Sequence, residues 1–222
     1  MKKPLLQRIM PFMKARFAPK GARISFSQYG EDLIIKNILK KEGIKDITYI
    51  DIGTHHPYFG NNTYLFYKSG GKGVLVEPNS EMCKVIENKR PRDICLNAGA
   101  GSQDGEADFY EFKQSTRNTF SKANAEEQEK RVGENSEVKK RKIIPLNTIV
   151  DEYFKDKDIS FVSIDAEGLD FDILSSFNFS KRPKVFCIES NTEDHRVDNF
   201  MKEKGYKCVA QIFQNAIFVD KK

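Results

Sequence analysis

The sequence predicts an α/β domain in which a mostly parallel sheet carries helices on both faces. Short, nearly continuous apolar segments, such as 47–53 and 72–78, alternate with segments whose apolar residues have helical spacing. Strands that are apolar throughout are buried on both faces, which is typical of parallel sheets. Two strand-like stretches within 206–220 predict a terminal hairpin that adds antiparallel strands at one edge. With 222 residues, the chain is long enough to bury one sizeable core.

Strands and helices alternate regularly in the first half of the chain. The first predicted helix ends at Gly43, where its apolar spacing stops. Asn61 or Asn62 can cap the helix that ends at Gly70, and Asn79 or Ser80 can cap the next one. The predicted order is helix 27–43, strand 47–53, helix 61–70, strand 72–78, helix 80–90 and strand 93–101.

A charged insertion near 113–142 interrupts the second half. Almost no apolar residue lies between Phe120 and Ile143, so the segment is either a mobile excursion or a helix solvated on every side. It could also cover a substrate, with Arg117, Asn118 and Thr119 reaching inward. The elements predicted around it are edge strand 106–112, a brief strand and a helix within 142–154, a strand, a turn at Gly168 and a helix within 159–177, strand 184–190, helix 193–205 and hairpin 206–220.

The composition excludes some classes of protein. Apolar residues make up 39% of the chain and charged residues 31%, but 17 Phe and 8 Tyr supply enough bulk for a packed core, which argues against disorder. The net charge of +5 allows an anionic substrate or a membrane surface as a partner. Because the basic residues are interspersed with acidic ones, we expect no nucleic-acid partner.

Residues 1–24 are predicted to form a basic extension ahead of a single domain over 25–222. The first 23 residues contain seven Lys or Arg, no acid and three prolines that break any long helix. The extension either contacts a membrane surface or a partner, or packs on the domain or stays loose. The four cysteines lack metal-ligand spacing, and no apolar run of about 18 residues occurs. We therefore expect a cytoplasmic protein, with peripheral membrane association through the extension as an open alternative.

Acidic residues gather where the predicted strands end. In an open α/β sheet, ligands bind outside the carboxyl ends of the strands. Four of the five strand ends carry a carboxylate: Asp51-Ile52-Gly53, Glu77-Pro78, Asp165-Ala166-Glu167-Gly168 and Glu189-Ser190-Asn191, whereas Asn97-Ala98-Gly99 does not. A purely structural sheet does not need this pattern, so it predicts a ligand site at this edge.

Glu77 is the strongest candidate for contact with a nucleoside. It closes the second strand, where an acid in a nucleotide site accepts hydrogen bonds from two ribose hydroxyls. Gly53 would let a ligand approach the backbone closely, because a Cβ there would intrude. The alternative is that Glu77 and Asn97 only cap the next helix or turn.

The loop after the first strand favours one cofactor over another. A nicotinamide dinucleotide site needs G-x-G-x-x-G at this place to hold a pyrophosphate. The loop reads DIGTHHPYFGNN, with its two glycines seven positions apart. A nucleoside without phosphate, such as S-adenosylmethionine, fits this loop better.

Several motifs resemble the FkbM-type methyltransferases, which methylate hydroxyl groups with S-adenosylmethionine. They are spread over residues 25–190, which is most of the chain, and read FSQYGEDLII, YIDIGTHHPYFGNNTYLFY, GVLVEPN, LNAGAG and VSIDAEGLDFDIL. The resemblance implies a Rossmann-like class I methyltransferase sheet, seven-stranded with a reversed last strand, and acceptors that are often sugars, glycans or natural-product alcohols. The cofactor-binding residues expected at these motifs are Gln28, Asp51, Gly53, Glu77, Pro78, Asn97, Ala98 and Asp165.

Four residues are candidates for the chemistry of methyl transfer. A sugar hydroxyl is a poor nucleophile until its proton is taken, so a base or a metal ion is expected. His55 and His56 follow the first strand and titrate near neutral pH; alternatively, one of them only orders the loop. Asp165 and Glu167 are the other catalytic candidates, or instead a positioning residue and a turn residue.

A divalent cation is a further hypothesis. Asp165 and Glu189 end neighbouring predicted strands, so their carboxylates could share a hard cation such as Mg²⁺. Two other functions remain open from the residues alone: an NAD(P)-dependent oxidoreductase on a similar sheet, and a non-catalytic nucleoside-binding module. The expected partner is a small-molecule or glycan acceptor.

Overall fold

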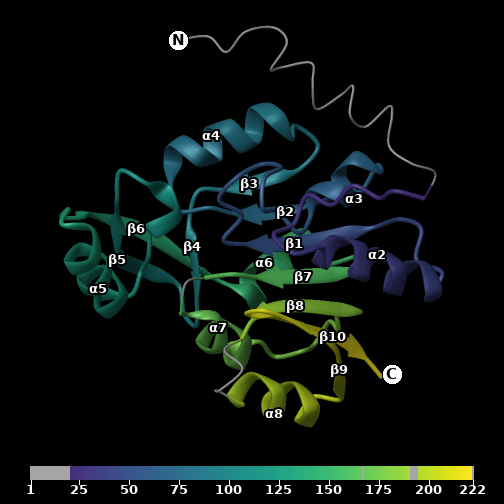
Figure 1. The fold of residues 1–222 in the computed structure, drawn as a ribbon. Helices are drawn as coiled ribbons and strands as arrows, with labels where there is room; N and C mark the ends of the chain where they lie inside the picture. Colours follow the sequence, from purple (N-terminus) through teal and green to yellow (C-terminus); the bar gives the residue numbers. More distant parts are fainter. Residues whose placement is uncertain (1–20, 167, 191–194, 222) are drawn as a thin grey trace, which may run out of the picture.

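A computed structural model describes residues 21–166, 168–190 and 195–221. A seven-stranded sheet forms its centre, and a smaller sheet lies beside it (Figure 1). The predicted basic extension falls almost wholly outside the described residues, so its contacts stay a prediction. No helix among the described residues is long and apolar enough to cross a membrane.

The large sheet is mostly parallel, as the sequence predicts. Its strands, in spatial order, are β3 (Ile94–Leu96), β2 (Lys72–Val76), β1 (Thr48–Ile52), β7 (Phe161–Ile164), β8 (Val185–Glu189), β10 (Asn215–Asp220) and β9 (Tyr206–Ile212). The first five strands pair in parallel, and β10 pairs antiparallel with both β8 and β9. The last strand is therefore the reversed one, and it lies between β8 and β9.

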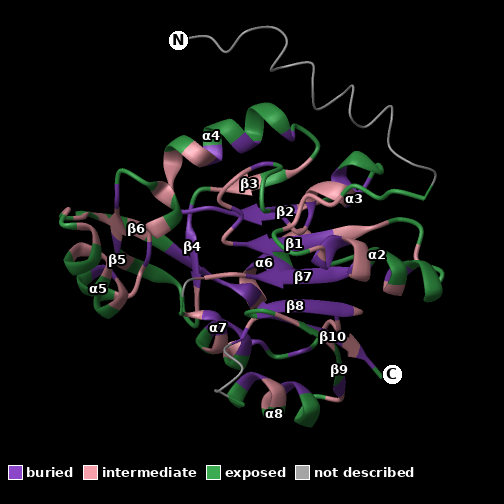
Figure 2. Ribbon diagram, viewed as in Figure 1, coloured by how far each residue is buried: buried purple, intermediate pink, exposed green. Residues whose placement is uncertain are grey.

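Helices cover both faces of this sheet. One face packs against α2 (Glu31–Lys41) and α3 (Tyr64–Lys68), and the other against α6 (Leu146–Tyr153), α7 (Asp170–Ser176) and α8 (Arg196–Glu203). Side chains alternate along a strand, so Tyr49 of β1 joins the first core, whereas Ile50 and Ile52 join the second. Figure 2 shows the central strands buried and the outer sides of the helices exposed.

The helix after β2 begins at its predicted cap. In α4 (Ser80–Lys89), the Asn79 side chain accepts hydrogen bonds from the backbone N–H groups of Glu81 and Met82, at 3.0 and 3.1 Å. The preceding helix is shorter than predicted and begins only at Tyr64. The Asn61 side chain still accepts from the Tyr64 N–H at 2.8 Å, in the manner of a cap.

The predicted strand 93–101 is divided between two sheets. Its first part is β3, and after a tight turn its second part is β4 (Gly99–Gly101), which belongs to the small sheet β4-β6-β5. The other strands of this sheet are β5 (Gly105–Glu111) and β6 (Glu137–Pro145). Between them lie a 3₁₀ turn, η1 (Ser115–Arg117), and α5 (Lys122–Val132).

The charged insertion is thus more regular than the sequence predicts. Helix α5 matches the solvated-helix alternative, because Ala125 is its only buried residue. Strand β6, which pairs with β5, was not predicted over 137–141. This stretch is polar because its side chains form ion pairs across the sheet: Lys139 and Arg141 lie 2.8 and 2.6 Å from Glu111.

Candidate functional site

A cavity of about 240 Å³ lies at the carboxyl end of the large sheet, between that sheet and the small one. The ends of β1, β2 and β7 form one side, and β4, β5 and the segment 115–120 form the other. Five of the predicted cofactor-binding residues line it, namely Gln28, Gly53, Glu77, Pro78 and Asp165, and so does His55, a predicted catalytic residue.

The Glu77 carboxylate is fixed by hydrogen bonds from two backbone N–H groups. One carboxylate oxygen accepts the His55 backbone N–H at 2.7 Å, and the other accepts the Asn79 N–H at 2.8 Å. The residue is 4% exposed, and burial raises the pKa of its carboxyl to about 7. Each oxygen keeps acceptor capacity for a ligand in the cavity.

The backbone conformation and the packing around position 53 require a glycine there, whether or not a ligand binds. Its φ of 77° lies in the left-handed region, and a Cβ there would lie 1.8 Å from the backbone oxygen of Asp165. From the sequence, the reason expected for this glycine is the close approach of a ligand to the backbone. In the structure, the crowding comes from the backbone at the end of β7, although Gly53 also lines the cavity.

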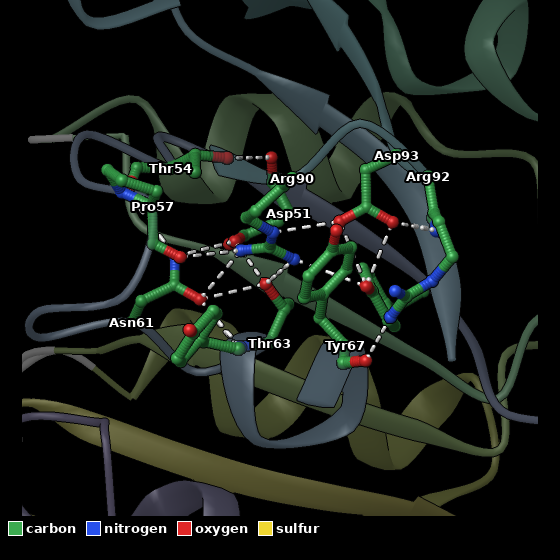
Figure 3. Close-up of polar contacts among 12 residues, drawn as sticks. Asp51, Thr54, Pro57, Asn61, Thr63, Tyr67, Arg90, Arg92 and Asp93 are labelled. Carbon is green, nitrogen blue, oxygen red and sulfur yellow. Dashed lines mark hydrogen bonds and ion pairs between the residues drawn. The ribbon is translucent and has the colours of Figure 1, made fainter. Parts of the chain in front are cut away.

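Asp51 does not line the cavity. One of its carboxylate oxygens accepts hydrogen bonds from the side chains of Asn61 and Thr63 at 3.0 and 2.7 Å, within a buried polar network (Figure 3). Burial raises the pKa of this carboxyl, and the charge of Arg90 lowers it in part. The carboxylate is thus engaged with the loop after β1.

The two adjacent histidines occupy different places. His55 lines the cavity, and its Nε2 lies 3.0 Å from Ser115 Oγ, which connects the two sheets. Burial lowers the pKa of His55, so the ring is neutral at pH 7. His56 is not among the lining residues; its Nδ1 accepts the backbone N–H groups of Tyr58 and Phe59 at 3.3 and 3.1 Å. His56 therefore orders the loop. This is the alternative to catalysis that the sequence offers for one of the two histidines.

Asp165 lies at the wall with other acids close by. Burial is the main cause that raises the pKa of its carboxyl well above the usual range, and Glu189 and Asp170 add to it by charge repulsion. Asp170 accepts the backbone N–H groups of Ala166 and Gly168, at 2.7 and 3.1 Å, and so orders the turn after β7. Glu167, the fourth catalytic candidate, lies outside the described residues.

Asp165 and Glu189 are the predicted metal ligands. Among the described residues, no group of three or more His, Cys, Asp or Glu side chains is arranged to hold a metal ion. Two carboxylates alone can still hold Mg²⁺ when water or substrate oxygens complete its coordination. The cation therefore stays a prediction.

The remaining predicted cofactor residues lie just outside the cavity. The Asn97 side chain donates to the backbone oxygens of Glu77 and Pro78, at 2.9 and 3.1 Å, and so fixes the end of β2. Ala98 is buried, and its neighbours Gly99 and Ala100 line the cavity instead.

Strand β5 and the segment 115–120, which lies between β5 and β6, supply a wall of the cavity that the sequence largely does not predict. Its residues are Phe109, Ser115, Thr116, Asn118, Thr119 and Phe120. In the alternative that this segment covers a substrate, Arg117, Asn118 and Thr119 would reach inward; Asn118 and Thr119 line the cavity, whereas Arg117 is not among the lining residues. The available signal was the stretch 114–120, which carries one charged residue, Arg117, within an otherwise highly charged insertion.

The sheet order defines a Rossmann-like α/β protein, and its cavity lies at the carboxyl edge of the sheet, where ligands bind in such proteins. A family model described as the methyltransferase FkbM domain matches residues 51–208, and the chain belongs to this family. A search among curated proteins returned no match.

Two solved structures are similar over nearly the whole chain at low identity. A TehB-like SAM-dependent methyltransferase from Corynebacterium glutamicum is 11% identical, with 99% of this chain and 100% of that chain covered and a TM-score of 0.44. An O-methyltransferase from Bacillus cereus, solved in complex with SAH, is 13% identical, with 100% and 92% covered and a TM-score of 0.41.

Proposed function

We propose that the protein is an S-adenosylmethionine-dependent O-methyltransferase that acts on a hydroxyl of a sugar, glycan or natural-product acceptor. The observation that carries this proposal is Glu77, buried at the end of β2 in a cavity of an FkbM-family chain. Its two oxygens already accept one backbone N–H each and keep capacity for two further donors. A pair of ribose hydroxyls supplies that number.

The other lining residues fit a nucleoside. Val76, Pro78 and Ala100 offer apolar surface beside Glu77, and apolar lining with a few placed polar groups is typical of cofactor sites. The cofactor would supply a methyl group on a positively charged sulfur. Asp165 offers a carboxyl at the same cavity, and a positive charge beside it would lower its raised pKa and favour the carboxylate, which would then balance that charge.

The residues at the wall can also serve the acceptor. Methyl transfer would form a C–O bond to the acceptor and break the C–S bond of the cofactor, and the hydroxyl proton would pass to a base. The His55 ring, neutral because burial lowers its pKa, is the candidate for that base. Its Nε2 contacts Ser115 Oγ at 3.0 Å, so an acceptor hydroxyl would take the place of the serine or share the ring with it.

A polyhydroxylated acceptor suits the opposite wall. Ser115, Thr116 and Asn118 present hydroxyl and amide groups there, and such groups both donate and accept hydrogen bonds. This supports an alcohol acceptor with several polar groups.

Calorimetric titration with S-adenosylmethionine, S-adenosylhomocysteine and NADH tests the proposal. We expect the two sulfur nucleosides to bind and NADH not to bind. Glu77→Gln should weaken binding at least tenfold, which is about 1.4 kcal/mol, because an amide is a poorer acceptor for two hydroxyls. Glu81→Gln, an exposed neighbour on α4, is the matched control and should bind as the wild type does.

A preference for NADH, or no binding of either sulfur nucleoside, would sink the proposal. Transfer of labelled methyl from S-adenosylmethionine to a panel of sugar and natural-product alcohols then tests O-methylation. The same assay with EDTA tests the predicted cation at Asp165 and Glu189: undiminished transfer would contradict it.

A further inference from the structure

The largest fully buried side chain of the described residues is a cation. Arg90 follows the last residue of α4 and is 0% exposed. A buried guanidinium is destabilising unless every donor is bonded and its charge is balanced. Arg90 is therefore held in place by its surroundings, which Figure 3 draws.

All five N–H donors of Arg90 are used. Nε donates to the Asp93 carboxylate at 2.8 Å. Nη1 donates to the backbone oxygen of Pro57 at 3.3 Å and to Asn61 Oδ1 at 3.1 Å. Nη2 donates to the Tyr49 hydroxyl at 3.2 Å and to Thr63 Oγ1 at 2.9 Å. No donor remains for a ligand.

Aromatic rings enclose the same guanidinium. Its carbon lies 5.6, 6.0 and 5.2 Å from the ring centres of Tyr49, Tyr64 and Tyr67. Contact with aromatic faces stabilises a planar cation and limits its movement. A lysine at this position has three donors on a flexible stem and cannot reproduce five directed bonds.

Three of the five acceptors belong to one loop, the segment 53–63 between β1 and α3. Asn61 extends the network, because its amide donates to Asp51 at 3.0 Å and to the Thr54 backbone oxygen at 3.4 Å. The loop is thus fixed near its start, at its middle and at its end. Its residues Thr54, His55, Phe59 and Gly60 line the cavity.

We propose that Arg90 is a positioning residue, which sets the loop 53–63 so that the His55 backbone N–H meets Glu77 and the His55 ring meets Ser115. Arg90 lies outside the cavity lining and acts only through the loop. That Arg90 matters for catalysis rests on the methyltransferase function proposed above. Its effect on the position of the loop 53–63 does not.

The pKa of the Glu77 carboxyl depends on the position of the loop 53–63. Burial raises the pKa of Glu77, as do the charges of Asp51 and Glu111, whereas the hydrogen bonds from the Asn79 and His55 N–H groups lower it. If the loop moves and the bond from His55 is lost, the pKa of Glu77 rises. A purely structural arginine would change stability without moving this titration.

Arg90→Lys tests the proposal, with Arg182→Lys as the matched control. Arg182 also pairs with an aspartate, Asp220, and lies 4.7 Å from the ring centre of a tyrosine, Tyr206, but at the opposite edge of the sheet. We expect Arg90→Lys to speed amide hydrogen exchange in 54–63 at least tenfold, whereas Arg182→Lys leaves exchange there unchanged. This measurement needs no ligand.

The second readout is S-adenosylhomocysteine binding between pH 5.5 and 8.5. Arg90→Lys should weaken it about tenfold at pH 7 and move its midpoint to higher pH, and Arg182→Lys should do neither. If wild type does not bind, the proposed function fails while the exchange result still stands. If Arg90→Lys lowers stability but leaves exchange in 54–63 and the binding midpoint at wild-type values, Arg90 has no positioning role.

Discussion

At the scale of single residues, Asp51 and Glu77 show how two buried acids on adjacent strands take different tasks. Both are acids near the end of adjacent parallel strands, and both are 4% exposed. Asp51 meets two side-chain donors and a nearby guanidinium, whereas Glu77 meets two backbone N–H groups and faces the cavity. Only Glu77 is left with acceptors that a ligand can reach.

Binding of S-adenosylhomocysteine should therefore strengthen as the pH rises through about 7, the pKa of Glu77. Hydroxyl donors stabilise the carboxylate, so they bind the ionised form better, and protonation at lower pH removes an acceptor. Calorimetry across this range measures the effect.

Glu77→Gln is the control for that experiment. A glutamine does not titrate, so its binding curve should be flat near neutral pH. Any slope that remains would belong to His55 or Asp165, which line the same cavity. A wild-type curve with no change near pH 7 would contradict the role of Glu77.

At the scale of elements, the junction of β1 and β7 depends on one glycine. Gly53→Ala should destabilise the protein by more than about 2 kcal/mol, because a left-handed φ and a clash with a backbone oxygen act together. Gly70→Ala is the matched control: its φ is +97°, but no atom lies within 4 Å of an added Cβ. It should lose only about 1 kcal/mol.

Urea unfolding of both variants measures the difference. Equal losses in Gly53→Ala and Gly70→Ala would mean that the close approach to Asp165 relaxes without penalty. In that case the Asp165 backbone would not require the glycine, and its positive φ and the close approach of a ligand would be the remaining reasons for the missing side chain.

The elements that the sequence predicts are those with local signals. Strands β1, β2, β7 and β8 are apolar runs, and Asn79 is a cap of the expected type. Strand β6 was missed over 137–141 because it is stabilised by ion pairs to Glu111 instead of an apolar face. Arg90 was missed because an arginine after a helix is usually solvated, and only tertiary contacts from Pro57, Asn61 and Thr63 reveal its burial.

At the scale of the whole molecule, the cavity joins two sheets. Phe120 packs over Gly99 so closely that a Cβ on that glycine would lie 2.4 Å from its ring, and its ring centre lies 4.6 Å from that of Phe109. Both phenylalanines also line the cavity. A ligand there touches the large sheet and the small one at once, so its binding should stabilise their association.

S-adenosylhomocysteine at 100 times its dissociation constant should stabilise the folded state by about 2.7 kcal/mol. For a protein of this size, that corresponds to a rise in Tm of roughly 5–10 °C. Phe120→Ala should lower the Tm without ligand and, at the same ligand concentration, reduce the rise, because it removes apolar contact from both sheets and from the cavity. Val138→Ala, in the same small sheet and 53% exposed, should change neither value. A ligand-induced rise as large in Phe120→Ala as in the wild type would place the nucleoside against the large sheet alone and leave the small sheet to the acceptor.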